Sequence, residues 1–160
     1  MIKYTHILLA LTSAISFCTA HANVQDDFNT VRECASTYYN QDLNNVVLNY
    51  TNDTSIYATA HTSRRVIVFN YTAAHLLKSD QLQFVLAHEI AHIANQHYGH
   101  SRDHERQADT DAISILHHCN LDMNGYKSLL EASQDSMGVH DNNDTRIKLI
   151  NTHIKTLNRL

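Results

Sequence analysis

The stretch FVLAHEIAHIANQH, residues 84–97, places two histidines four positions apart, with a glutamate directly after the first. On a helix, His88 and His92 lie one turn apart on the same face, so both imidazoles can reach one ion. Glu89 is rotated by about 100° from His88, which suits holding a water better than binding the metal. The chain has 13 histidines, and about 0.03 matches to this pattern are expected by chance. The motif therefore needs support from its surroundings.

The length and charge of the chain limit the classes of protein to which it can belong. At 160 residues it is long enough for one domain with a real core and too short for a second. Its formal net charge is −4 at pH 7, and its basic residues form no cluster that would attract nucleic acid. No apolar run beyond the N-terminal segment is long enough to cross a membrane. We expect neither a nucleic-acid partner nor a membrane span in the mature chain.

The N-terminus has the form of a secretory signal peptide. Lys3 supplies a positive charge, residues 7–17 (ILLALTSAISF) are apolar but too short to span a bilayer, and residues 20–22 (AHA) match an A-x-A cleavage site. This predicts a signal peptide over residues 1–22 and a mature domain over residues 23–160, exported to the periplasm or secreted. The alternative is a signal anchor that stays attached.

Two cysteines remain after the signal segment, Cys34 and Cys119. In an oxidising compartment two leftover cysteines usually form one disulfide. Closing so long a loop stabilises a fold by up to about 4–5 kcal/mol in the chain-entropy model. The alternative is a metal site at residues 117–119 (HHC), but three consecutive residues on a helix point in different directions.

The spacing of apolar residues predicts an α+β fold, in which a small antiparallel sheet packs on a helical core. Apolar positions at Phe28, Val31, Ala35 and Tyr38 or Tyr39 indicate a helix over residues 25–45. Short β-branched and aromatic runs then predict three strands, at residues 46–48, 55–60 and 65–69.

Four further helices are predicted after Asn70. The first begins at Ser79 or Asp80 and ends near Gly99. The positions expected to form its buried side are Leu82, Val85, Leu86, Ile90 and Ile93. The other three run from about Asp103 to Cys119, from Asn124 to Ala132 and from Asp144 to Leu157.

A catalytic zinc keeps three protein ligands and one open position, so a third ligand is needed. Glu105 opens the next predicted helix after a short loop, and its carboxylate can complete the site. Asp109 lies one turn further on, where it can accept a proton from the second nitrogen of a ligand histidine and fix its tautomer. The alternative is that Glu105 and Asp109 are solvated acids on a helix face.

Three more histidines, His97, His100 and His104, lie between the two helices that carry the ligands. We expect them to be solvated loop residues. The alternatives are a second metal site or a pH-sensitive activity.

Four pieces of the sequence together resemble the M48 family of zinc metallopeptidases. Ahead of the motif, SIYATA (55–60), RVIVF (65–69) and LLKSDQL (76–82) are similar to the family's paired strands and approach to the active-site helix. Behind it, Glu105 to Asp109 followed by Ala112 has the form of the family's E-x-x-A-D helix. His140, Arg146 and Ile147 resemble its C-terminal His-Pro…Arg-Ile pattern, although Asp141 stands where the proline is usual. The resemblance covers residues 55–149 and looks like a minimal version of the zincin-like catalytic domain.

The resemblance implies a zinc-dependent endopeptidase. His88, His92 and Glu105 would bind one Zn²⁺ per chain, and Glu89 would take a proton from the attacking water. His140 or Arg146 would stabilise the oxyanion, and the alternative for Arg146 is a structural ion pair with Asp109. The partner would be a polypeptide substrate, extended along a predicted edge strand at Arg65–Phe69.

Two other classes of function stay open. A peptide-binding or chaperone-like protein would use its zinc structurally and would have no need of Glu89 as a base. A metal buffer would use the many histidines as several weak sites. The presence of Glu89 favours the enzyme.

Overall fold

The computed structural model describes residues 24–55, 57–99, 101–133 and 140–159. The predicted signal segment, Asn23 and His100 lie outside the described residues. After a helix that is described from residue 24 to residue 39, the elements are β1 (Val47–Thr51), β2 (Ala58–His61), the 3-10 turn η1 (Thr62–Arg64), β3 (Val66–Asn70), α2 (Tyr71–Leu76), α3 (Ser79–Ala94), α4 (Arg102–His118), α5 (Gly125–Ala132) and α6 (Asn143–Leu157). The fold is α+β, as predicted. None of the helices in these residues has the length and apolar character of a membrane span.

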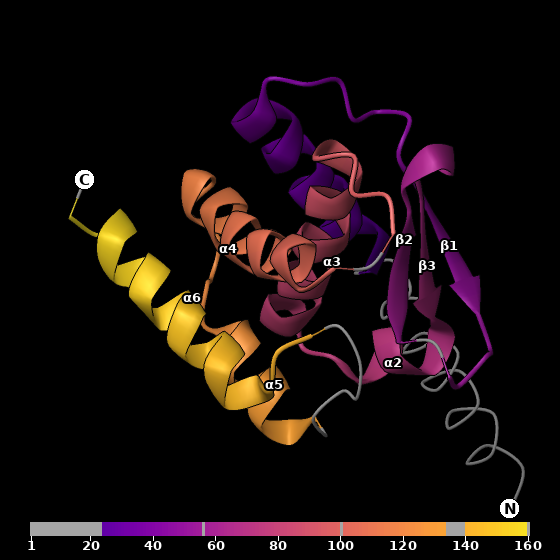
Figure 1. Ribbon diagram of the computed structural model, residues 1–160. Coiled ribbons are helices and arrows are strands. Elements are labelled where there is room, and N and C mark those ends of the chain that lie inside the picture. The colour runs from indigo at the N-terminus through magenta and orange to yellow at the C-terminus, as the bar shows by residue number, and fades with distance from the viewer. Residues whose placement is uncertain (1–23, 56, 100, 134–139, 160) are drawn as a thin grey trace, which may run out of the picture.

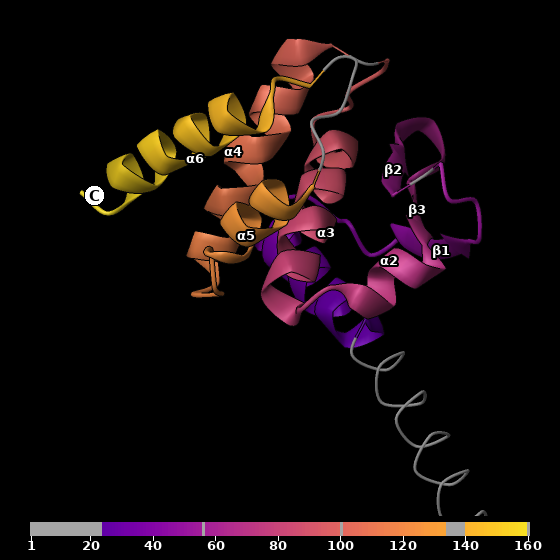
Figure 2. The ribbon, with the colours of Figure 1, turned by 90° about the horizontal axis from the view of Figure 1, so that it is seen from below.

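Helix α3 lies at the centre of the molecule, between the helices α4–α6 and the sheet (Figures 1 and 2). It contacts α4, α5 and β2. The predicted buried side is confirmed, since each of its five apolar positions is buried: Leu82, Val85, Leu86, Ile90 and Ile93. Ala87 and Ala91, on the flanks of that side, are also fully buried. A helix covered on nearly all sides holds its polar side chains in fixed surroundings.

The N-terminal helix packs through the predicted stripe, because Phe28, Val31 and Ala35 are all buried. It ends at residue 39, six residues earlier than predicted. Asn40 follows in the left-handed region, with φ of 50°, which a continuing helix does not allow.

The three strands form one mixed sheet in the order β1-β3-β2. β2 pairs antiparallel with β3, but β1 pairs parallel with it, Val47 lying opposite Val66. The prediction of an antiparallel sheet is therefore wrong for β1. The prediction that Arg65–Phe69 is an edge strand is also wrong, because β3 lies between two partners. Ile67 and Phe69 have no exposed surface, as expected for a central strand.

β2 is one of the two edge strands of this sheet, and it packs against α3 (Figure 1). The N–H of Asn70 donates to the carbonyl of Tyr57 at 2.8 Å, and pairing alternates along an antiparallel ladder. The main-chain groups of Ala58 and Ala60 therefore point away from β3.

Helix α3 ends at Ala94, five residues before the predicted end near Gly99. Gln96 adopts a left-handed conformation, with φ of 54°. The N–H of Gln96 donates to the carbonyl of Ile93 at 3.2 Å, and the N–H of His97 donates to the carbonyl of His92 at 3.0 Å. These two bonds define a Schellman turn, which folds His97 back over the last turn of the helix.

Helix α5 packs closely on the start of α3 through Gly125, where any Cβ would overlap the backbone of Asp80. The next residue, Tyr126, packs against Phe84 of α3 with 5.9 Å between ring centres and the ring planes tilted by 52°. Its hydroxyl donates to Asn151 of α6 at 2.7 Å. These contacts hold α5 and α6 against α3.

The structure contains the predicted disulfide between Cys34 and Cys119, whose Cα atoms lie 5.9 Å apart. It joins the N-terminal helix to the residue that follows α4. Because the thiol of Cys119 is used in this bond, the alternative metal site at residues 117–119 has no thiolate to offer.

Candidate metal centre

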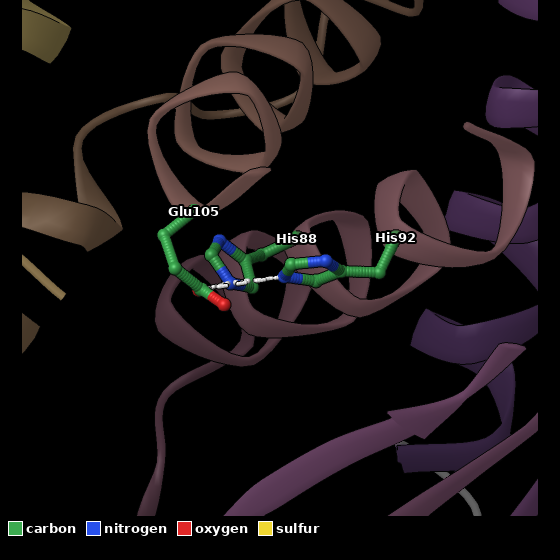
Figure 3. A group of neighbouring side chains, drawn as sticks. All are labelled: His88, His92 and Glu105. Carbon is green, nitrogen blue, oxygen red and sulfur yellow. Dashed lines mark hydrogen bonds and ion pairs between the residues drawn. The ribbon is translucent and has the colours of Figure 1, made fainter. Parts of the chain in front are cut away.

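Three side chains converge between α3 and α4: His88, His92 and Glu105 (Figure 3). Nε2 of His88 lies 3.1 Å from Nε2 of His92. Oε2 of Glu105 lies 3.3 Å from the first of these nitrogens and 3.4 Å from the second. Donors bound tetrahedrally to zinc at about 2.0–2.1 Å are about 3.3–3.4 Å from one another, so these three donor atoms have the spacing of a zinc site.

The secondary structure accounts for this convergence. His88 and His92 are one turn apart on the covered helix α3. Glu105 lies in the first turn of α4, whose N-cap Ser101 accepts a hydrogen bond from the N–H of His104 at 3.2 Å. Glu105 is only 4% exposed, so the solvated alternative is excluded for this carboxylate.

A second carboxylate supports His88 from behind. Oδ1 of Asp109, one turn beyond Glu105, lies 3.0 Å from Nδ1 of His88. Arg146 of α6 donates to both oxygens of Asp109, from Nε at 2.8 Å and from a terminal nitrogen at 2.7 Å. Burial alone would raise the pKa of Asp109, but the hydrogen bonds from Arg146 and His88 lower it to about 2. Asp109 is thus an anion that accepts from His88 and leaves Nε2 of that ring facing the cluster.

The electrostatics of the cluster favour a cation. Burial lowers the pKa of His88, but its hydrogen bonds to Asp109 and Glu105 outweigh burial and raise it to about 10. Burial likewise opposes the ionisation of Glu105, yet its hydrogen bonds to His88 and His92 bring its pKa well below the usual range. Two carboxylates around two imidazoles therefore stabilise positive charge at their centre, and a divalent metal ion carries such charge.

Glu89 lines a cleft of about 260 Å³ together with His88, His92 and Glu105. Glu89 is 8% exposed, and burial raises the pKa of its carboxyl group. The backbone N–H of Ala60 on β2 hydrogen-bonds this carboxylate and partly offsets the rise. The arrangement places an acceptor beside the ligand cluster, with the edge strand forming the opposite wall of the cleft.

The expectation that His97 is solvated is wrong. This side chain is 8% exposed, and its Nδ1 lies 3.0 Å from Nδ1 of His92. Burial is the largest influence on the pKa of His97 and lowers it. The sequence did not reveal this contact, because it depends on a Schellman turn, which brings together residues five apart, and Gln96 is not a residue typical of that turn. His104, in contrast, is partly exposed.

The two candidates for the oxyanion donor lie in different surroundings. Nδ1 of His140 is 3.2 Å from Oε2 of Glu105, and His140 lines the cleft with His88, His92 and Glu105. Arg146 forms the ion pair with Asp109 that the sequence offered as its structural alternative.

A second cavity, of about 320 Å³, lies against the other side of His88 and Glu89. Its apolar wall consists of side chains from the residue before β2, from α3 and from α5: Tyr57, Phe84, Val85, Leu129 and Leu130. His140 and Arg146 also line this cavity. An apolar hollow therefore opens next to the polar ligand cluster.

Comparison with known proteins gives one result. The model of peptidase family M48 matches residues 21–101, which include His88, Glu89 and His92. No curated protein and no solved structure matches the chain. The match covers half of the sequence, and the buried His-His-Glu cluster has the donor set of a zinc site. The chain therefore belongs to peptidase family M48, a family of zinc metallopeptidases.

Proposed function

We propose that the protein is an active zinc endopeptidase that binds one zinc ion through His88, His92 and Glu105. The observation that carries the proposal is the spacing of the three buried donor atoms, 3.1–3.4 Å, beside a glutamate in the same cleft. A structural zinc site closes its coordination with a fourth protein ligand, whereas a catalytic site keeps an open position. The open cleft in front of the cluster supports the catalytic kind.

Glu89 is the general base in this proposal. When bound, zinc supplies Lewis acidity and lowers the pKa of a water ligand to about 7. Glu89 removes a proton from the attacking water and later delivers it to the leaving amine. The raised pKa of its buried carboxyl group matches it to this task, because a base works best with a pKa near the working pH.

The substrate lies along β2 in this proposal, instead of along β3. Ala58 and Ala60 line the cleft, and their main-chain groups point away from β3. The N–H of Ala60 already bonds Glu89, so the N–H of Ala58 and the two carbonyl groups are the ones available for pairing. An extended peptide could add to this edge through main-chain hydrogen bonds, with little demand on its side chains. The apolar cavity next to Glu89 would then hold a large apolar side chain beside the scissile bond.

His140 is the better candidate for the oxyanion donor. It lines both cavities, whereas Arg146 lines only the apolar one. Both nitrogens of Arg146 that contact Asp109 are within 2.8 Å of it, so we assign Arg146 to positioning Asp109.

Export is part of the proposal. The signal segment at residues 1–22 predicts an oxidising destination, and the disulfide supports it. Mass spectrometry of exported material should find a chain that begins at Asn23 and is about 2 Da lighter than its reduced form. A retained Met1 or two free thiols would contradict this part.

The experiment that tests the function is cleavage of casein and of a peptide library by the mature chain. We expect cleavage that a chelator abolishes and that zinc restores. Mapped sites should show a large apolar residue next to the cut bond. A protein that binds these peptides with zinc present but cleaves none would instead be a peptide-binding protein.

A further inference from the structure

The turn that ends α3 brings a second histidine onto a metal ligand. Gln96, in the left-handed conformation, reverses the chain, and the N–H of His97 bonds to the carbonyl of His92 itself. In this Schellman arrangement the residue after the turn packs over the residue five positions earlier. The contact between His97 and His92 is thus built into the main chain.

The hydrogen bonds behind His92 all point the same way, each residue donating to the next. If Nε2 of His92 binds a metal, its Nδ1 must carry the ring proton. That N–H can then donate to Nδ1 of His97, 3.0 Å away. A neutral His97 that accepts at Nδ1 carries its own proton on Nε2, which faces Oε1 of Gln107 at 3.2 Å. The ring N–H of His92 and the ring N–H of His97 therefore each meet an acceptor.

The position of His97 is fixed on two further sides. The hydroxyl of Thr62 in η1 donates to its carbonyl at 3.0 Å. The ring of His104 stacks on its ring, with 4.2 Å between centres and 5° between planes. The residue is thus held by the wall of the cleft on one side and by α4 on the other, with its Nδ1 aimed at the ligand.

We propose that His97 is a positioning residue for the metal centre: its Nδ1 accepts the proton of His92 and so fixes the tautomer and orientation of that ligand. The inference rests on the metal site of the proposed function. A hydrogen-bond partner behind a ligand histidine typically changes metal affinity about 10–100-fold when it is lost. His97 would do for His92 what Asp109 does for His88, without carrying a charge.

Two replacements of His97 separate this role from simple packing. His97→Asn keeps an acceptor oxygen at the place of Nδ1, whereas His97→Leu fills the same space with methyl groups. His104→Leu is the matched control, because it changes the stacked neighbour without touching the contact to His92. Each variant is first compared with the parent by circular dichroism, and its disulfide is verified by mass.

Zinc affinity is then measured by competition with a chromophoric chelator, together with the visible spectrum of the cobalt(II) form. We expect His97→Leu to lower affinity about 10–100-fold and to shift the cobalt bands. His97→Asn and His104→Leu should stay within about threefold of the parent, the asparagine because it still accepts from His92.

The outcomes are distinct. If the parent binds zinc and His97→Leu binds it equally tightly with an unchanged cobalt spectrum, the inference is overturned while the proposed function stands. If His97→Asn loses as much affinity as His97→Leu, the accepting atom is not what matters, and the inference is overturned too. A parent that holds no zinc overturns both.

Discussion

The two histidines on α3 that we propose as zinc ligands are supported in opposite ways. Behind His88 lies a charged pair, Asp109 with Arg146, in which Asp109 is 1% exposed. Behind His92 lies a neutral series, His97 with Gln107, at the rim of the cleft. A buried charged pair binds structural elements together, so its loss should harm both the fold and the metal site. A neutral partner on a turn should matter for the metal alone.

Breaking the charged side should have the largest effect. Asp109→Asn leaves the largely buried guanidinium of Arg146 without its anion and gives His88 a weaker acceptor. We expect a loss of about 3–5 kcal/mol in the free energy of unfolding of the metal-free protein and about 10–100-fold weaker zinc binding. Denaturant unfolding and chelator competition measure these two quantities.

The direction in which the free energy of unfolding changes with pH follows from the pKa of Asp109. Its pKa in the folded state, about 2, lies below its ordinary value of 3.8, so its contribution is present above about pH 4 and is lost as the pH falls towards 2. Unfolding should therefore be compared at pH 7. Asp111→Asn is a control on the same helix, bonded to Tyr39 and Asn95 and away from the ligands. If it weakens zinc binding as much as Asp109→Asn does, the contrast between the two sides fails.

Removing the other member of the pair should separate stability from metal binding. Arg146→Met leaves Asp109 in place behind His88 but removes its cationic partner. We expect the free energy of unfolding to fall by about 3 kcal/mol, while zinc affinity stays within about tenfold of the parent because the acceptor remains. A variant that folds normally but loses turnover at full zinc content would instead assign Arg146 to the oxyanion.

The sequence placed Asp109 behind a ligand histidine because its signals are local, whereas it offered the ion pair of Asp109 with Arg146 only as an alternative. His88 and His92, and Glu105 and Asp109, are each four residues apart, and helical periodicity alone places each pair on one face. The prediction that the two helices meet at these faces rested on the number of ligands that zinc needs and on the family resemblance.

The contact between His97 and His92 and the strand order of the sheet were not predicted, and the reasons are physical. The role of His97 depends on α3 ending at Ala94, yet Gln96 is not a residue that usually marks a left-handed helix end. The pairing of β1 with β3 depends on contacts between residues distant in the chain. A run of residues such as Val66–Asn70 has a pattern that fits an edge strand and a central strand equally well.

Relaxing the turn that carries His97 should have the smallest effect. Gln96→Gly removes the cost of a side chain in the left-handed region, and we expect the protein to gain about 0.5–1 kcal/mol of stability. Zinc affinity should not change, because the turn and the ring of His97 are retained. Asn120→Gly at the end of α4, where φ is 56°, is the control and should gain less, since asparagine tolerates this conformation. A gain accompanied by loss of zinc would show that strain in the turn serves the site.

The most direct test measures zinc content and peptidase rate on the same preparations of two variants. Glu89→Gln should keep one zinc per chain and lose about 10²–10⁴-fold in rate, because an amide has nearly the same shape but cannot accept the proton. Glu105→Gln should instead lose zinc, because a neutral amide is a poor ligand. If Glu89→Gln cleaves peptides as fast as the parent, Glu89 is not the base and the proposed mechanism is wrong.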